Sequence, residues 1–224
     1  MEYEVSPWLY FGMSVLVIVA LCILAVLLTR KLELVPTSRR QNFVEFIVAS
    51  LDDFTRGVIG PEGRKYTPFI GTLFIYILVM NLLGLIPPLR SPTSNLSTTI
   101  SLALIVFVMF NVAGIRKLGF VNYLKQMLPG PPWLWILIFP IELIGMLARP
   151  LSLSIRLYGN IFGEETVLAV LASLTFVVIP YIIALPTQFP IMLFAIFTSF
   201  IQALVFTMLS ATYIAMAIAG SEEH

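Results

Sequence analysis

Long apolar stretches that alternate with short polar segments dominate the pattern along the chain. These stretches lie at 8–30, 69–87, 98–116, 133–179 and 188–219. A helix of about 20 mostly apolar residues is long enough to cross the hydrocarbon core of a bilayer. The pattern therefore predicts one membrane domain over 1–224, all-α, with a membrane-crossing helix at each of these stretches, five in all.

The segment 41–59 has a different pattern, because its apolar residues recur at three- and four-residue steps. They are Phe43, Phe46, Ile47, Leu51, Phe54 and Val58. Polar and charged residues occupy much of the other side. This pattern predicts an amphipathic helix that lies on the membrane surface and does not cross it.

The segment 133–179 is too long for one upright crossing, because a single helix over it would span about 70 Å. It is either two crossings broken near Pro150 or one strongly tilted helix, and hydropathy leaves both open. Arg30, Lys31, Arg116 and Lys117 follow apolar stretches, and positive residues favour the cytoplasmic side. We therefore expect the N-terminus outside and, if 133–179 crosses once, the C-terminus in the cytoplasm.

Composition agrees with a membrane protein: of 224 residues, 59% are hydrophobic and 11% charged, whereas a soluble domain is about a quarter charged. A net charge of +1 without a basic cluster argues against nucleic acid as a partner. The single cysteine, Cys22, and the single histidine, His224, leave no basis for an internal disulfide or a metal site. Without a glycine-rich nucleotide motif either, we expect no cofactor and no enzyme activity of the chain alone.

Ionisable residues inside 133–179 are the strongest functional signal. An arginine at the centre of a membrane helix costs roughly 2.5–3.5 kcal/mol on insertion scales, so it indicates a functional site. Read as a helix, Glu142, Arg149, Arg156 and Gly163 recur every seven residues on one stripe. Asn160 lies on the same side as Arg156.

Glu165 follows Arg156 by nine residues, so it lies on the opposite side of that helix. Arginine keeps its proton at ordinary pH, and a permanent cation suits a barrier between two proton paths, whereas a glutamate in a hydrated pocket can accept and release protons. The alternatives are structural. Arg156 snorkels or forms a salt bridge, Arg149 is interfacial beside Pro150, and Glu164 and Glu165 form internal ion pairs.

Small residues spaced by four mark the last apolar stretch: Ser199, Ala203, Thr207, Ala211, Ala215 and Ala219. Such a ridge lets another helix approach closely. Gln202 lies one residue from the ridge. We expect it to be a buried hydrogen-bonding group with a role in an ion pathway.

Three segments together resemble subunit a of the F-type ATP synthase. They are RPLSLSIRLYGN followed by Glu165, MNLLGLIP at 80–87, and FTSFIQALVFTMLSATYIAMA at 197–217. The resemblance implies one outer span, a surface helix, a hairpin of two spans, and two long tilted helices against a ring of c subunits. It favours one tilted helix over 133–179.

The resemblance also implies roles for individual residues. Arg156 would face the carboxylate of the c-ring and keep two half-channels apart. Glu165, with Asn160 and Gln202, would line the outer half-channel, and Glu142 would lie near the cytoplasmic exit.

Two positions depart from the pattern of many bacterial relatives, which have a small residue before that glutamate and a histidine seven residues before the glutamine. Here these residues are Glu164 and Ala195. A carboxylate on one helix would then replace a histidine on the facing helix.

The function implied is a proton-conducting stator subunit of a rotary ATP synthase in a bacterial inner membrane. Its partners would be the c-ring, the peripheral-stalk b subunits and membrane lipids, with H⁺ as the transported ion and Na⁺ left open. The alternative is a secondary ion-coupled transporter, but that class usually shows inverted repeats, and the sequence shows none.

Overall fold

The computed structural model describes residues 7–30, 38–86, 89, 91–126, 135–178 and 188–219. These residues form helices joined by turns, with no strand in the described ranges. In chain order the elements are α1 (Pro7–Thr29), α2 (Arg39–Ile59), the 3₁₀ helix η1 (Pro61–Lys65), α3 (Thr67–Leu83), the 3₁₀ helix η2 (Pro92–Ser94), α4 (Leu96–Leu118), α5 (Phe120–Gln126), α6 (Trp135–Val178) and α7 (Gln188–Ile218).

Four of the described helices are long and apolar enough to cross a membrane: α1, α4, α6 and α7. α3 is equally apolar but has only 17 residues. The protein is therefore an all-α membrane protein, as the hydropathy pattern predicts. The number of five crossings stays a prediction, because α3 lies just below the usual length of a spanning helix.

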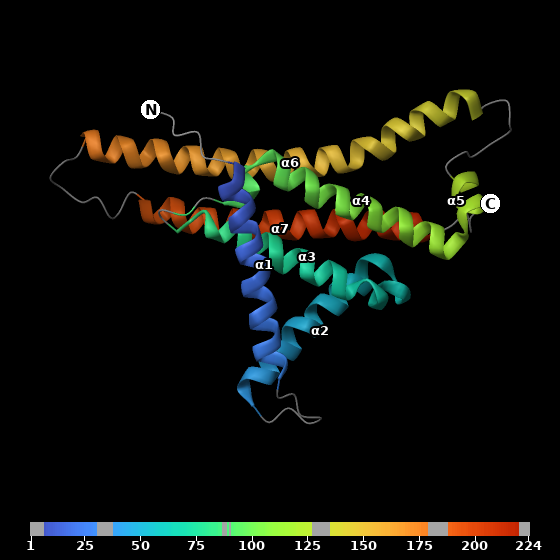
Figure 1. The fold of residues 1–224 in the computed structure, drawn as a ribbon, viewed down its shortest axis with the longest axis horizontal. Helices are drawn as coiled ribbons and strands as arrows, with labels where there is room; N and C mark the ends of the chain where they lie inside the picture. Colours follow the sequence, from blue (N-terminus) through green and yellow to red (C-terminus); the bar gives the residue numbers. More distant parts are fainter. Residues whose placement is uncertain are drawn as a thin grey trace.

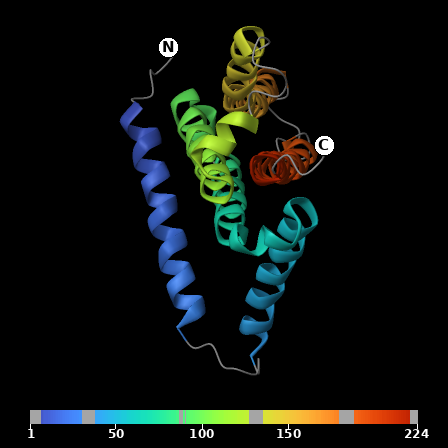
Figure 2. The same ribbon diagram turned by 90° about the vertical axis from the view of Figure 1, so that its right-hand side faces the viewer.

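The two longest helices, α6 and α7, run alongside each other, and α3 and α4 pack against them (Figure 1). α4 contacts both α6 and α7, whereas α3 contacts chiefly α7. α1 runs crosswise to α6 and α7, and among the described elements it contacts chiefly α3, η2 and α2. Figure 2 shows that the end of α1 lies near the start of α2 and that the two helices diverge from there.

α6 is one continuous helix of 44 residues, although it contains Pro140 and Pro150. A proline inside a helix removes one backbone hydrogen bond and bends the axis. Figure 1 shows this bend, since the first part of α6 (yellow) points away from the line of the remainder. The single long helix agrees with the resemblance described above, whereas hydropathy alone left a break near Pro150 equally open.

The core lies where α3, α4, α6 and α7 meet. Its fully buried large side chains recur at helical spacing and include Ile70, Ile77, Met80, Val106, Phe110, Leu153, Leu157, Phe206 and Ile214. The same face of α7 contributes small side chains, among them Ala203 and Ala211, which are both completely buried. Helices approach closely at such positions, so the ridge predicted on the last stretch serves helix packing.

α2 turns the aromatic side chains of its first half outward. Phe43 and Phe46 are 65% and 69% exposed, whereas the buried residues of this helix are Gln41 and Thr55. In a soluble protein a helix normally buries its apolar side and exposes its polar side. An amphipathic helix at a membrane surface instead exposes its apolar side to lipid. The first half of α2 thus has an exposed apolar side, whereas Phe54 in its second half packs against the core.

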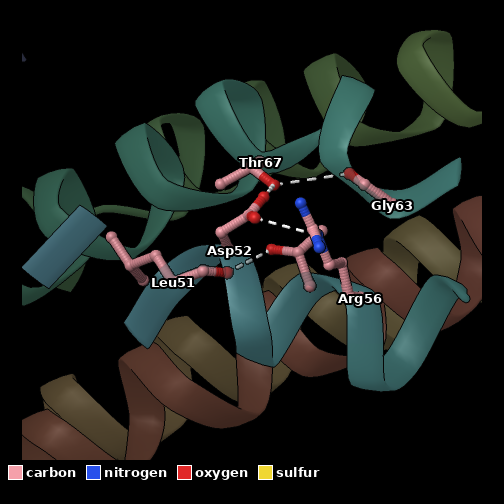
Figure 3. A network of polar contacts seen from close by, with 6 residues as sticks. Leu51, Asp52, Arg56, Gly63 and Thr67 are labelled. Carbon is pink, nitrogen blue, oxygen red and sulfur yellow. Dashed lines mark hydrogen bonds and ion pairs between the residues drawn. The ribbon is translucent and has the colours of Figure 1, made fainter. Parts of the chain in front are cut away.

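A small polar network joins α2 to the start of α3 (Figure 3). The hydroxyl of Thr67 donates a hydrogen bond of 2.7 Å to Asp52, which also forms an ion pair of 2.8 Å with Arg56. Gly63 lies against the backbone of Thr55, and a Cβ atom there would be 2.8 Å from the Thr55 carbonyl oxygen. α2 and η1 are therefore packed backbone to backbone.

We expect Gly63→Ala to lower the stability of the protein by about 1–3 kcal/mol, because overpacking against backbone cannot be relieved by a side-chain shift. The control is Gly57→Ala in α2, where a Cβ atom would meet nothing within 4 Å. Thermal denaturation of the detergent-solubilised protein measures both. Equal midpoints for the two variants would contradict the close packing of η1 on α2.

Candidate ion-translocation site

Arg156 lies near the middle of α6 with its side chain exposed. It forms no hydrogen bond or ion pair with any residue in the described part of the chain. Its neighbours on the same stripe include Gly159 and Gly163. The space beside both is open, since a Cβ atom added to either would meet nothing within 4 Å. The internal salt bridge considered for Arg156 is absent among the described residues, and its surroundings leave room for another molecule.

A cleft of about 390 Å³ opens between α6 and α7 on the side of Arg156 toward the end of α6. Its lining residues are Asn160, Ile161, Gly163, Glu164, Val167, Phe194, Ala195, Thr198, Ile201 and Gln202. Most of them are apolar, so the few polar groups decide what the cleft can bind.

Two hydrogen bonds cross this cleft from α6 to α7. Asn160 Nδ2 donates to Gln202 Oε1 at 2.6 Å, and Thr198 Oγ1 donates to Glu164 Oε2 at 2.8 Å. Gln202 is only 5% exposed, and its Nε2 atom finds no acceptor among the described residues. A buried donor without an acceptor costs free energy, and such groups are rare. In the cleft this donor belongs to Gln202, the residue for which a role in an ion pathway is predicted.

Glu165 points to different surroundings from Glu164, because successive residues of a helix differ by about 100°. The backbone N–H of Ser91 donates to Glu165 Oε1 at 2.8 Å. Gly84, directly after α3, makes room for this carboxylate: a Cβ atom there would lie 3.0 Å from Glu165 Oε1 and 2.9 Å from Ser91 Cβ. The two neighbouring carboxylates therefore have different hydrogen-bond partners.

Behind Glu165 lies a buried network of hydroxyl and amide groups. Ser91 Oγ donates to the Met80 carbonyl at 2.9 Å and lies 2.5 Å from Thr93 Oγ1, which donates to Asn81 Oδ1 at 2.7 Å. Asn81 Nδ2 donates to the Ser199 carbonyl at 3.5 Å. A continuous polar connection thus runs from α6 through η2 and α3 to α7.

Sequence reasoning missed four members of these networks, Asn81, Ser91, Thr93 and Thr198. The available signal was Asn81, a polar residue within the apolar MNLLGLIP stretch, followed at once by the polar segment RSPTSNLSTT. An amide in an apolar helix needs partners, and the following hydroxyl-rich segment supplies them.

The other predicted carboxylate, Glu142, lies about 33 Å along the helix from Glu164 at 1.5 Å per residue. Its Oε1 atom is 3.7 Å from Arg149 Nη2. The guanidinium carbon of Arg149 is 5.8 Å from the centre of the Tyr213 ring on α7. Arg149 therefore has the internal ion pair that Arg156 lacks.

Taken together, the structure brings Asn160, Glu164 and Gln202 into one cleft and places Glu165 outside the lining of that cleft, beside Ser91 and Gly84. Glu142 lies in a separate group toward the opposite end of α6, and Arg156 lies between the two. Polar and ionisable groups at two depths of a membrane helix are typical of ion-transport proteins. The fold and the site thus define an all-α membrane protein of ion transport.

The comparisons with known proteins specify the family. The sequence model of the family described as "ATP synthase A chain" matches residues 11–215. Proteins named ATP synthase subunit a are similar to the chain. That of Aliarcobacter butzleri is 42% identical over 221 residues, which cover 98% of this chain and 93% of the relative. That of Geobacter sulfurreducens is 43% identical over 89% and 82%, and that of Protochlamydia amoebophila is 37% identical over 94% and 80%. The chain belongs to the ATP synthase A chain family.

We expect Thr93→Val to destabilise the protein by about 1–3 kcal/mol, because it leaves the buried Asn81 Oδ1 without its donor. Thr98→Val is the matched control, since the Thr98 side chain forms no hydrogen bond with a described residue. Its effect should stay within about 0.5 kcal/mol. Denaturation in detergent compares the two, and equal losses would show that the network contributes no stability.

Proposed function

We propose that this chain is the proton-conducting stator subunit of an F-type ATP synthase. Membership of the family supports the complex, and the placement of the ionisable groups supports the mechanism. One half-channel would lead protons to a carboxylate on a ring of c subunits, and the second would release them after the ring has turned.

The observation that carries this proposal is the isolated position of Arg156 between two polar regions. A fixed cation repels protons and attracts a carboxylate, and arginine does not release its own proton. A proton therefore cannot pass directly from one region to the other. It has to travel on the ring, which couples proton flow to rotation. Each charge that crosses the membrane supplies about 2.3 kcal/mol per 100 mV, so several crossings are needed for one ATP.

The exposed face around Arg156 would lie against the c-ring. Peripheral-stalk b subunits and lipids would cover other parts of the surface. We assign the η2 end to the outer side and the α5 end to the cytoplasm of a bacterial inner membrane, because Arg116 and Lys117 end α4 beside α5. The N-terminus would then lie outside, the C-terminus in the cytoplasm, and Glu142 near the inner exit.

Glu164 and Glu165 would both serve the outer half-channel, with different tasks. Glu164 lines the cleft and bonds to Thr198, one turn from the completely buried Ala195. It therefore has the position to replace a histidine at 195 as the group that hands protons toward the ring. Glu165 accepts from the η2 backbone and would receive protons at the entrance.

Arg156→Ala should reduce ATP synthesis driven by an imposed proton gradient to background, because protons could then pass between the half-channels without rotation. The assay uses membrane vesicles that carry the whole complex. Arg64→Ala, which removes an exposed cation outside the spans, is the control. Normal synthesis with Arg156→Ala in an assembled complex would refute the proposed mechanism.

Glu164→Gln should strongly reduce proton flux through the complex, because an amide cannot bind and release a proton at this position. Glu164→Gly should lose proton flux in the same way. We further expect the double variant Glu164→Gly with Ala195→His to regain part of this flux, since the histidine returns a titratable group to the cleft from the facing helix. Glu165→Gln is measured in parallel. Unchanged flux in Glu164→Gln would exclude the exchange of roles between positions 164 and 195.

A further inference from the structure

We propose that Arg149 and Tyr213 are positioning residues that hold Glu142 at the inner end of the proton path. The inference rests on the proposed function, in which Glu142 lies near the inner exit, and it takes Glu142 as the acceptor of protons that leave the ring. It assigns a task to a cation and an aromatic ring that the proposed mechanism has not used.

Glu142 has little else to orient it. It is half-buried, and its neighbours on α6, Ile141, Leu143 and Ile144, are 62%, 42% and 67% exposed. Within the described part of the chain, Arg149 is the single group that forms an ion pair or hydrogen bond with it. The direction of the Glu142 carboxylate therefore depends on where Arg149 lies.

The separation of the pair suits a carboxylate that has to exchange protons. At 3.7 Å between Nη2 and Oε1, the attraction is one of charge, because the distance exceeds that of a hydrogen bond. Arg149 can thus orient Glu142 without occupying its lone pairs. Both carboxylate oxygens remain able to accept a proton or a hydrogen bond from water.

Arg149 is itself held by Tyr213. The guanidinium lies over the Tyr213 ring, a favourable cation–π arrangement. That ring in turn packs against Phe110 of α4, with 6.0 Å between the ring centres, and Phe110 is 1% exposed. The position of Arg149 is therefore fixed by the core of the helix bundle through one aromatic contact.

α5 closes the same region from the side. The ring of Tyr123 fills a slot at Gly114, where a Cβ atom would overlap it, and its hydroxyl donates to Asn111 Oδ1 at 3.0 Å. Burial raises the pKa of Tyr123, so the hydroxyl keeps the proton that it donates; Arg149 and Glu142 both lie close enough to influence this pKa. Arg149 thus contacts α7 directly, and Phe110 of α4 and Tyr123 of α5 lie around that contact.

The two arginines of α6 have opposite environments on one stripe. Arg149 is tied to a carboxylate and a ring, whereas Arg156, one heptad later, has no partner among the described residues. A tied cation cannot follow a moving ring carboxylate, but it can keep a fixed acceptor in place.

The test measures passive proton conduction through complete complexes in vesicles, after the extrinsic catalytic part is removed, under an imposed potassium diffusion potential. Tyr213→Leu and Arg149→Gln should slow conduction several-fold, whereas Tyr213→Phe, which keeps the ring, and Arg149→Lys, which keeps the charge, should retain most of it. The amount of assembled complex is determined for each variant, and conduction is expressed per complex.

Each of these changes is also combined with Glu142→Gln in a double variant. If Arg149 and Tyr213 act through Glu142, then Arg149→Gln and Tyr213→Leu should cause no further loss in that background. An equal fold-loss with and without Glu142, or a Tyr213→Phe as slow as Tyr213→Leu, would overturn the positioning role. Wild-type conduction in Glu142→Gln would refute the exit role of Glu142 itself, and Arg156→Ala in the same assay tests the proposed function separately.

Discussion

The cost of placing charge in hydrocarbon is the constraint on which this structure depends. An ionised group at membrane depth needs a partner, a polar cavity or another molecule to replace water. α6 satisfies this need in three ways. Arg149 has an ion pair and a ring, Glu164 and Glu165 accept hydrogen bonds from Thr198 and the Ser91 backbone, and Arg156 faces outward. The groups that serve these needs explain much of the polar content of α3, η2 and α7.

Hydropathy predicted an all-α membrane protein correctly, because membrane helices obey a simple length rule. The stretch 188–219 corresponds to α7, Gln188–Ile218, and 98–116 lies within α4, Leu96–Leu118. Helix continuity through Pro150 could not be predicted in the same way. A proline costs a hydrogen bond in any helix, and whether neighbouring helices offset that cost is a property of the packed bundle.

The candidate site was only partly visible in the sequence. The pairing of Asn160 with Gln202 connects residues 42 positions apart, and both had been singled out as polar groups in apolar helices. The separation of Glu164 from Glu165 depends on the path of the segment between α3 and α4, which brings the Ser91 N–H to one carboxylate alone. Local periodicity contains no information about that path, so the division of tasks between the two residues required the fold.

The small side chains beside Arg156 have a mechanical consequence. Ser152 and Gly159 are exposed on its stripe, and Gly163 follows one turn later without a Cβ atom. Helices that interdigitate ridges and grooves resist sliding, because each step must lift one side chain over another. Between Ser152 and Gly163 this stripe has one long charged side chain among small residues, so it offers little resistance of this kind. A partner helix can therefore slide along this part of α6. Electrostatic attraction to Arg156, and not interlocking side chains, then determines where the partner stops.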